Sequence, residues 1–371
     1  MLRAACAMAA MMGLFPAVAA EPPADETLLV IEPSKAYPRN SEGDLIELRD
    51  GRLYFVYTRF TGGGADHAAA EIVARTSSDG GRQWSEDRVV VANEGAQNVM
   101  SASILRLRDG ALLLFYLRKN DACDCTAYVR RSTDEFETLG EPVRVSVADG
   151  YHVVNNDRVV QLSTGRLVVP AAWHPCQDGD RKVWGSRALP RVFVSDDEGR
   201  TWRMDADSAT ERPMPQVVLQ EPGVVELTDK RLWMWFRTDK GVQYSSFSKD
   251  GGLRWSEPEP SRLASPLSPA TIERIPWTGD LLCVWNDHSG RHVYPKGKRS
   301  PLCVAISRDD GQTWTPSRVI EGDPEGWYCY TSITFLKDRA ILSYCAGDKK
   351  VGGLNRLKML ALSRAWLYRD E

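Results

Sequence analysis

The sequence lacks a strong excess of charge of either sign, since 47 lysines and arginines stand against 50 aspartates and glutamates. The resulting net charge of −3 gives no support for binding nucleic acid through a basic face. Beyond the N-terminus the sequence also lacks any unbroken run of about 18 apolar residues, so no membrane span is expected.

Histidine is scarce, with 5 in 371 residues, and no cysteines form a CxxC pair. A zinc site therefore has little support, and nothing in the sequence demands a metal or an organic cofactor. With 43% apolar and 26% charged residues, the composition excludes disorder, collagen and a coiled coil. What the sequence has in quantity is tryptophan, at 12 residues, and glycine, at 29, which together favour a repetitive β protein.

Residues 1–20 have the pattern of a signal peptide. Arg3 is followed by an apolar stretch that ends at the small residues Ala17, Val18 and Ala19. We expect an exported protein, periplasmic or secreted, with a mature chain of residues 21–371. Its cysteines would be odd in number, so at least one thiol is expected to stay free beside one or two disulfides of open pairing.

Six short segments repeat along the chain, each an apolar residue followed by a polar turn and a β-rich run. Each segment predicts two antiparallel strands joined by a tight turn. The segments are LRDGRLYFVY from Leu48, LRDGALLLFY from Leu107, LSTGRLVVP from Leu162, LTDKRLWMWF from Leu227, IPWTGDLLCVW from Ile275 and LKDRAILSY from Leu336.

A second motif, Ser-x-Asp-x-Gly-x-x-Trp, is interleaved with these hairpins. Its full copies are Ser77–Trp84, Ser195–Trp202, Ser248–Trp255 and Ser307–Trp314, and Ser132–Leu139 is a degenerate copy. Ser and Asp bond to nearby backbone N–H groups, Gly takes a backbone angle that other residues resist, and Trp can bury its ring against a neighbouring unit. One carboxylate per turn is too few for a calcium cage, so we interpret the motif as structural.

Six four-stranded antiparallel units with such turns predict an all-β fold, a six-bladed β-propeller, as a single domain over residues 21–371. Residues 356–366 are expected to form the third strand of the last blade. Residues 28–33 would add its fourth, outer strand and close the ring.

The first strand of each blade lines the central channel of a propeller, so residues shortly before each hairpin are expected to meet at one mouth. These residues are Arg39, Asn40, Asn98, Asn155, Asn156, Glu221, Ser268 and Tyr330. Buried polar groups are costly unless they are paired, so this polar set predicts a binding site. His67, His152 and His174 have no evident catalytic partner and are interpreted as loop or rim residues.

The motif copies and the polar residues together resemble the sialidase (neuraminidase) superfamily, over nearly the whole mature chain. The resemblance implies a six-bladed propeller with Asp-box turns that acts on sialic acid glycosides. It also implies a tyrosine nucleophile with a glutamate partner, an aspartate acid/base and an arginine triad. On this basis the nucleophile is Tyr330 in YTSITFL, its base is Glu221 in LQEPGVVEL, and the acid/base is Asp66 in the loop GGADHAAAE.

The same resemblance implies the substrate-binding arginines. Arg39 in YPRNSEGD, Arg237 in WMWFRTDKG and Arg299 in KRSPLCVAIS correspond to the triad, with Arg291 and Arg274 as alternatives to Arg299. Arg59 in VYTRF resembles a further arginine that contacts the ligand.

Sialic acid is a 2-keto acid sugar whose anomeric carbon carries a carboxylate, and arginines hold such a group with charge-assisted hydrogen bonds. An anionic nucleophile would be repelled by that carboxylate, whereas a neutral tyrosine would not. The predicted reaction is therefore the retaining hydrolysis of terminal sialic acid from sialylated glycans, through a tyrosyl-enzyme intermediate.

Two alternatives remain. Arg39-Asn40-Ser41 stands where the family usually has Arg-Ile-Pro, so the sugar could be another 2-keto-3-deoxy acid or a uronic acid of a polysaccharide. The other alternative is a non-catalytic propeller that binds glycans, which the presence of Asp66, Glu221 and Tyr330 disfavours. The sequence does not indicate the oligomeric state.

Overall fold

The computed structural model describes residues 25–177, 180–205 and 216–369 of the chain. The expected signal peptide, residues 1–20, lies outside the described residues. The described part is built of β-strands and one short helix near its C-terminal end, α1 (Arg364–Leu367). In these ranges no helix has the length and apolar character needed to cross a membrane.

Four of the sheets have four antiparallel strands each, and in three of them the strands lie side by side in chain order. The first of these three sheets contains β2 (Arg39–Glu47), β3 (Leu53–Phe60), β4 (Ala70–Ser77) and β5 (Arg88–Val91). Another contains β17 (Gln220–Glu226), β18 (Leu232–Arg237), β19 (Val242–Ser248) and β20 (Glu259–Ala264). The third contains β21 (Thr271–Arg274), β22 (Leu281–Trp285), β23 (Leu302–Ser307) and β24 (Arg318–Glu321).

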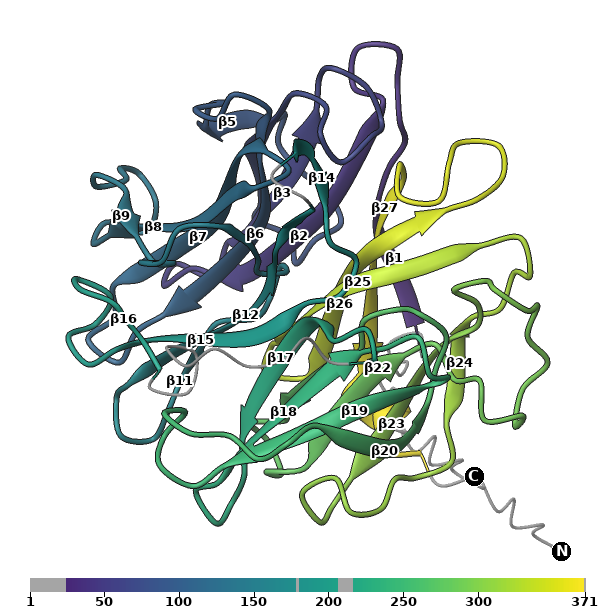
Figure 1. The fold of residues 1–371 in the computed structure, drawn as a ribbon. Coiled ribbons are helices and arrows are strands. Elements are labelled where there is room, and N and C mark those ends of the chain that lie inside the picture. The colour runs from purple at the N-terminus through teal and green to yellow at the C-terminus, as the bar shows by residue number, and fades with distance from the viewer. Residues whose placement is uncertain (1–24, 178–179, 206–215, 370–371) are drawn as a thin grey trace, which may run out of the picture.

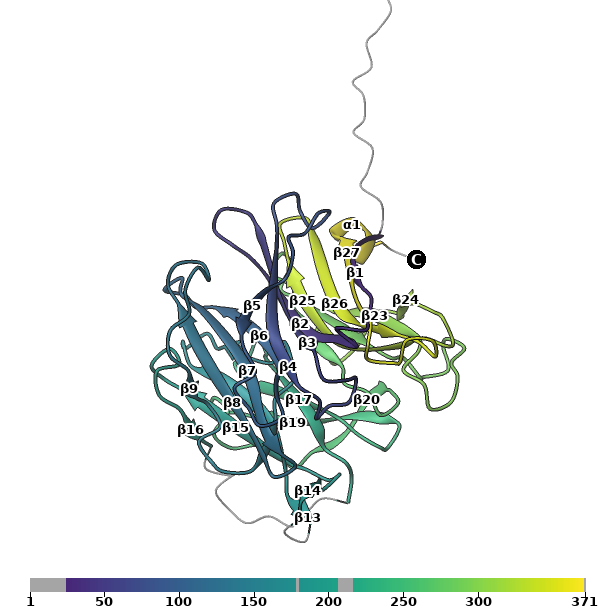
Figure 2. The same ribbon diagram turned by 90° about the horizontal axis from the view of Figure 1, so that it is seen from above.

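The fourth sheet joins the two ends of the described chain. It contains β25 (Trp327–Phe335), β26 (Arg339–Gly347), β27 (Leu357–Ser363) and β1 (Asp25–Ile31). Strand β1 pairs antiparallel with β27, from Asp25 opposite Leu362 to Ile31 opposite Leu357. The prediction that the N-terminal strand completes the last sheet is confirmed, and the N-terminal and C-terminal strands lie side by side (Figures 1 and 2).

The second and third units differ from the expected separate four-stranded sheets, because they share one nine-stranded sheet. Its strands are β6 (Asn98–Arg106), β7 (Leu112–Asp121), β8 (Asp124–Ser132), β9 (Val143–Arg144), β10 (Tyr151–Val153), β11 (Val160–Gln161), β12 (Leu167–His174), β15 (Leu189–Ser195) and β16 (Arg203–Met204). The link is β10, which pairs antiparallel with β12 and, through Tyr151 opposite Cys125, in parallel with β8.

A disulfide strengthens the same junction. Cys123, beside the start of β8, is bonded to Cys176, which opens the small hairpin of β13 (Cys176–Gln177) and β14 (Asp180–Trp184). The sequence had left this pairing open. Within the described residues the other cysteines, at 125, 283, 303, 329 and 345, are buried free thiols.

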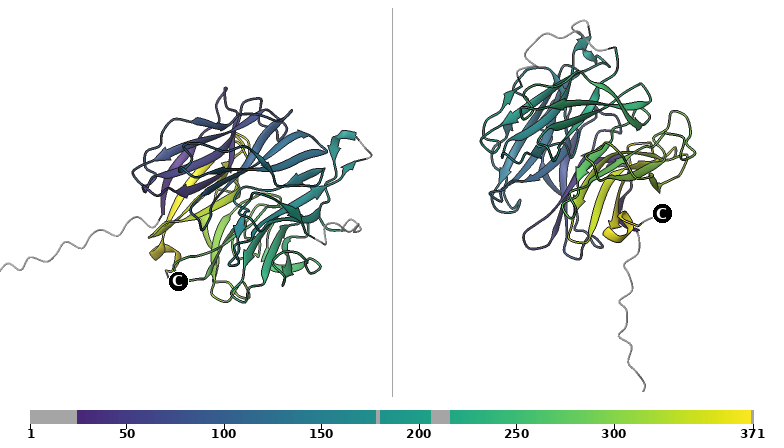
Figure 3. Two further views of the ribbon diagram at one scale, coloured as in Figure 1. Left: turned by 90° about the vertical axis from the view of Figure 1, so that its left-hand side faces the viewer. Right: turned by 90° about the horizontal axis from the view of Figure 1, so that it is seen from below.

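Six apolar clusters hold the units together, and each lies mainly between one unit and the next. The cluster that joins the last unit to the first contains Ile341 and Met359 from one side and Leu53 and Phe55 from the other. The innermost strands also contact one another, β2 with β6 and β25, and β21 with β17 and β25. The sheets accordingly follow one another around the molecule, from the N-terminal to the C-terminal colours (Figures 1 and 3).

The Ser-x-Asp-x-Gly-x-x-Trp turns are built as their residue types predict. Ser77 Oγ donates to Asp79 Oδ1 at 2.9 Å and accepts from the Gly81 amide at 2.8 Å, where Gly81 has a φ of +96°. In later copies the tryptophan packs on the preceding unit, with Trp202 edge-on to Phe115 at 5.9 Å between ring centroids. These turns therefore fix the outer ends of the sheets and bury aromatic surface between them.

Candidate active site

Five of the seven predicted site residues line one pocket of about 220 Å³: Asp66, Glu221, Arg237, Arg299 and Tyr330. They come from four different units of the fold and lie up to 264 positions apart in the sequence, between Asp66 and Tyr330. Arg39 reaches the group through Asp66. Arg59 does not line the pocket.

The pocket residues of the inner strands occupy equivalent positions. Tyr330 and Glu221 have φ values of +58° and +49°, and each lies at a break in strand register, on β25 and β17 respectively. Glu42 on β2 and Ser101 on β6 also have positive φ at such breaks and line the same pocket. A bulge turns a side chain out of the strand pattern, and residues held in this conformation cluster at functional sites.

Tyr330 and Glu221 are in direct contact. The Tyr330 hydroxyl donates to Glu221 Oε1 at 2.9 Å, and Arg237 Nη1 lies 2.6 Å from the same carboxylate oxygen. Burial raises the pKa of Glu221, but the charges of Arg237 and Arg299 and the two hydrogen bonds outweigh burial and lower it below its usual value. Glu221 is therefore ionised at neutral pH and can accept a proton from Tyr330.

Tyr330 holds its proton in the free enzyme. Burial raises the pKa of Tyr330 well above its usual value, and the nearby Glu221 charge raises it further. Asn156 fixes the backbone at this point, because its Nδ2 donates to the Tyr330 carbonyl at 3.0 Å and to the Gly43 carbonyl at 2.9 Å. The hydroxyl is thus held in place against its base.

Arg299 lines the pocket with a buried guanidinium group. Its guanidinium lies 5.4 Å from the centre of the Tyr330 ring, and the residue is only 8% exposed. Its Nε and Nη1 have no hydrogen-bond partner within the described part of the chain. Of the two alternatives, Arg274 pairs with Asp310 and Arg291 donates to the Ser317 carbonyl, and neither lines the pocket.

Arg39 is 1% exposed and is held from several sides. Its Nε donates to Ser41 Oγ at 2.9 Å, its Nη2 lies 3.1 Å from Glu42, and its Nη1 lies 2.5 Å from Asp66 Oδ1. Ser41, which departs from the family pattern, thus supplies one of the supports of Arg39.

Arg39 also sets the charge state of Asp66. Burial raises the pKa of Asp66, but the charge and the hydrogen bond of Arg39 outweigh burial and lower the pKa below its usual value, and the charges of Lys119 and Arg299 lower it further.

Arg59 lies in a separate ionic network. Its Nη2 is 2.6 Å from Glu71, and its Nη1 is 3.0 Å from Asp87. Its guanidinium also lies 4.2 Å from the centre of the Tyr37 ring. These contacts occupy the side chain between neighbouring strands of the first sheet, so the geometry gives it no access to the pocket.

Several residues that sequence reasoning missed line the pocket, among them Glu42, Ser101 and Lys119. Glu42 accepts from Ser101 Oγ at 2.9 Å. A signal for Lys119 existed, because it lies near the end of the second strand of its unit, as Arg237 does in its own. His174 also lines the pocket and His152 is fully buried, so the interpretation of these two histidines as rim residues is wrong.

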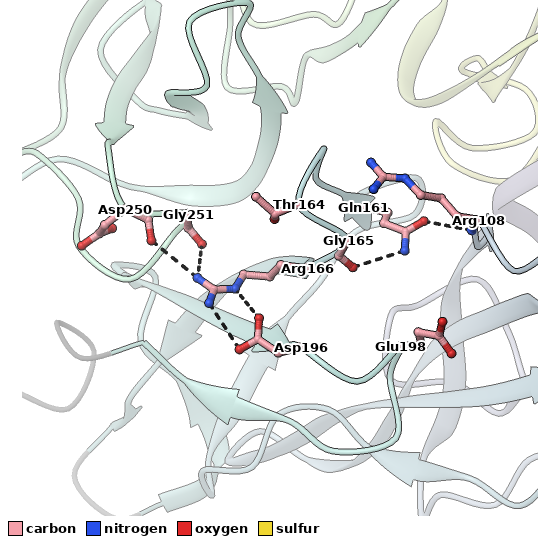
Figure 4. Close-up of a pocket in the computed structure, with 9 residues that line it drawn as sticks. All are labelled: Arg108, Gln161, Thr164, Gly165, Arg166, Asp196, Glu198, Asp250 and Gly251. Carbon is pink, nitrogen blue, oxygen red and sulfur yellow. Dashed lines mark hydrogen bonds and ion pairs between the residues drawn. The ribbon is translucent and has the colours of Figure 1, made fainter.

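A second hollow, of about 540 Å³, lies among the turns of the second, third and fourth units (Figure 4). Its charged groups largely satisfy one another, as Arg166 pairs with Asp196 at 2.6 Å and donates to the Gly251 carbonyl at 3.1 Å. It contains none of the predicted site residues. The 220 Å³ pocket is therefore the candidate active site.

Known proteins resemble this chain in sequence and in fold. Residues 51–342 match the family described as "BNR repeat-like domain". A sialidase of Bacteroides fragilis is 28% identical over an alignment of 221 positions, which covers 55% of this chain and 36% of that protein. A sialidase of Micromonospora viridifaciens is 26% identical over an alignment of 385 positions, which covers 91% of this chain and 56% of that protein.

The chain thus spans about a third and just over half of the lengths of these two relatives. Among solved structures, the Hadza microbial sialidase Hz136 superimposes with a TM-score of 0.68 at 18% identity, over 90% of this chain and 67% of that one. At that identity the likeness is one of fold.

Proposed function

The chain belongs to the BNR repeat-like domain family, and from this membership and the pocket we propose that it is a retaining exo-α-sialidase. The observation that carries the proposal is the hydrogen bond from Tyr330 to Glu221 at 2.9 Å, beside Arg237 and Arg299 in one pocket. A module that only bound glycans would need the arginines but not a buried tyrosine paired with a carboxylate. Terminal sialic acid on glycoproteins, glycolipids or oligosaccharides is the proposed substrate.

Substrate binding would rest on the arginines. The sugar carboxylate would accept hydrogen bonds from Arg299, whose Nε and Nη1 have no partner in the described chain, and from Arg237 and Arg39. Arginine keeps its charge at any working pH, and its planar fork matches a carboxylate. Holding this group would place the anomeric carbon over Tyr330.

In the first step the Tyr330 oxygen would attack the anomeric carbon while Glu221 takes its proton, and the bond to the leaving oxygen would break. Asp66 would supply the proton that the leaving oxygen needs. In the second step Asp66 would take a proton from water as the water attacks the anomeric carbon, and Tyr330 would leave and regain its proton from Glu221. Two displacements at one carbon would retain the anomeric configuration.

We further propose that the six units form the blades of a closed six-bladed propeller, with the pocket at one mouth of its channel. The six inter-unit clusters and the pairing of β1 with β27 support this arrangement. Export to the periplasm or beyond the cell also remains a proposal, based on residues 1–20. No metal or organic cofactor is needed by the steps above.

The test is hydrolysis of a 4-methylumbelliferyl sialoside by the purified protein, with Tyr330→Phe as the decisive variant. Tyr328→Phe is the matched control, because Tyr328 lies on the same strand but outside the pocket. We expect release by the wild type and by Tyr328→Phe, and a loss of about 10²–10⁴-fold in Tyr330→Phe. Full activity in Tyr330→Phe would overturn the assignment of the nucleophile.

A second candidate sugar follows from the pocket wall. Lys119 and Glu42 add a cation and a carboxylate to the pocket lining beside the arginines, and this polar lining also suits another 2-keto-3-deoxy acid or a uronic acid. Glycosides of these acids belong in the same assay. Turnover of one of them, with no release from any sialoside, would replace the sialidase proposal while leaving the fold and the arginines in their roles.

A further inference from the structure

We propose that Lys119 is a positioning residue that, together with Asn98, holds the loop of the acid/base Asp66 over the pocket. The inference rests on the proposed function for the role of Asp66, but the contacts stand by themselves. Lys119 Nζ donates to the backbone carbonyl of Asp66 at 3.0 Å. Asn98 Nδ2 donates to the same carbonyl at 2.9 Å and to that of Ala68 at 2.8 Å.

The loop needs such a support. Residues 61–69 run between β3 and β4, and the Asp66 side chain at their tip is 66% exposed. The backbone hydrogen bonds within the loop lie at its base, where Thr61 and Gly62 donate to Ala69, and at one turn from Ala68 to Ala65. Two side chains of the next unit therefore supply the contacts that fix the Asp66 backbone.

The two donors are themselves rigidly placed. Asn98 and Lys119 are opposite each other in the pairing of β6 with β7, and they are 0% and 5% exposed. Lys119 Nζ also donates to Met100 Sδ at 3.3 Å and lies 5.6 Å from the centre of the Tyr151 ring. Both residues belong to the second unit, so this unit helps to hold a loop of the first unit, together with Arg39, which donates to the Gly64 carbonyl at 3.4 Å.

The energetics support a functional reason for Lys119. A buried ammonium group is costly unless a carboxylate compensates it. Within the described ranges no carboxylate lies within salt-bridge distance of Lys119, whose ammonium donates to the Asp66 carbonyl and also bonds to the Tyr151 side chain. A methionine or leucine would fill the same space without the cost of burying a charge. We therefore attribute the ammonium group to the hydrogen bond that it donates to the Asp66 carbonyl.

Lys119 also acts on the charge of Asp66. Its ammonium contributes, after Arg39, to lowering the pKa of Asp66. Removing the ammonium should therefore raise the apparent pKa of the acid/base group, as well as loosen its loop. A lysine that only packed against its neighbours would have no such effect on the pKa of Asp66.

The experiment compares the wild type with Lys119→Met, which keeps the length of the apolar stem, on two sialosides. Sialyllactose has a poor leaving group that depends on the acid, whereas the 4-methylumbelliferyl glycoside has a good one that depends on it little. We expect kcat/KM to fall about 30-fold on sialyllactose and less than about threefold on the aryl glycoside. The alkaline limb of the sialyllactose pH profile should move to higher pH.

Equal losses on both substrates with an unmoved pH profile, or no loss on either, would overturn the inference. Lys349→Met is the matched control, because Lys349 is an exposed lysine outside the pocket. It should leave kcat/KM unchanged on both sialosides. If Lys119→Met does not fold, as judged by circular dichroism, Lys119→Gln takes its place.

Failure of the proposed function would be seen separately, as a wild type that hydrolyses neither sialoside. In that case hydrogen exchange of the amides of residues 61–69 decides the inference alone. Faster exchange in Lys119→Met than in wild type is expected, and unchanged exchange would overturn it.

Discussion

The Asp66 carboxylate lies 2.5 Å from Nη1 of Arg39, so the proposed acid/base occupies a nitrogen of the proposed substrate-binding arginine. A ligand carboxylate that binds Arg39 must displace it. Loss of the Arg39 contact removes the largest influence that lowers the pKa of Asp66. Substrate binding would thereby both free the acid and raise its pKa toward the range in which it can donate a proton.

Removing Asp66 should therefore separate binding from catalysis. In Asp66→Ala we expect tighter binding of the inhibitor 2,3-didehydro-2-deoxy-N-acetylneuraminic acid, by about tenfold or 1.4 kcal/mol. The reason is that the Asp66 carboxylate no longer competes with the carboxylate of the inhibitor for Arg39. Turnover of sialyllactose should fall by about 10²–10³-fold, since the leaving oxygen loses its proton donor.

Isothermal titration calorimetry and initial rates measure these two effects. Asp50→Asn, an exposed carboxylate in a turn of the same unit, is the control and should change neither. Weaker inhibitor binding in Asp66→Ala would show that Asp66 supports the arginine and does not compete with the ligand.

Arg299 offers a test of the arginine fork. Lysine at this position keeps the charge but cannot present the free Nε and Nη1 donors, so we expect KM for the aryl sialoside to rise about tenfold or more in Arg299→Lys. Arg291→Lys is the matched control and should leave KM unchanged, because Arg291 lies outside the pocket. A raised KM only in Arg291→Lys would transfer the third triad position to Arg291.

Arg59 is expected to affect stability and not catalysis. Its 10% exposed side chain pairs with Glu71 and Asp87, and Arg59→Ala would leave both carboxylates without this partner. We expect a loss of about 2–4 kcal/mol and a clearly lower Tm in differential scanning calorimetry. The kcat/KM measured at a temperature where the variant is folded should not change.

The control for Arg59 is Arg82→Ala. Arg82 pairs with Glu26 on the surface, where its side chain is 59% exposed, and such pairs contribute at most about 1 kcal/mol. A normal Tm together with a raised KM in Arg59→Ala would restore the ligand-binding role that the sequence suggested.

The different settings of Arg59 and Arg237 show why the site could be predicted only in part from the sequence. Tyr330 and Glu221 stand on inner strands shortly before a repeated hairpin, so the repeat itself predicted that they would approach each other. Arg59 and Arg237 have the same local setting, at the end of a second strand. They differ because Arg59 is paired with Glu71 and Asp87. Glu71 comes opposite Arg59 only through the pairing of β3 with β4, and Asp87 reaches it only in the folded sheet.

Other features were beyond the reach of the pattern. Strand β10 has three residues, too few for any periodicity, yet it joins two units into one sheet. Lys119 has the same local setting as Arg237, but its role depends on a loop 53 positions away in the sequence. Repeats predict which strands exist, whereas contacts across units decide what their side chains do.

A last feature of the fold concerns its centre, where Asp44, Asp157 and Glu273 lie near Arg158. Burial raises the pKa of Asp157 to about 6, although the Arg158 charge and the bond that its Oδ2 accepts from the Ile333 amide oppose the rise. Burial also raises the pKa values of Asp44 and Glu273, and the Asp157 charge raises them further. The folded state therefore keeps protons on this group at a pH where the unfolded chain has lost them.

This difference predicts the sign of the pH dependence. Because the folded pKa of Asp157 lies above its unfolded value of 3.8, its contribution to stability is complete below pH 3.8 and is lost as the pH rises through about 6. In Asp157→Asn that loss is absent. Relative to wild type, the variant should therefore gain stability between pH 4 and pH 7, by up to about 3 kcal/mol, since one pKa unit is about 1.4 kcal/mol.

Guanidinium denaturation at several pH values measures this difference, with Asp134→Asn as the control. Hydrogen bonds from Thr138 lower the pKa of Asp134 to about 2, so its carboxylate is ionised in both states from pH 5 upward, and the difference from wild type should not vary between pH 5 and pH 7. A loss of stability in Asp157→Asn that grows toward pH 7 would contradict the prediction. It would mean that the ionised carboxylate stabilises the fold by pairing with Arg158, and that this attraction outweighs the cost of burying its charge.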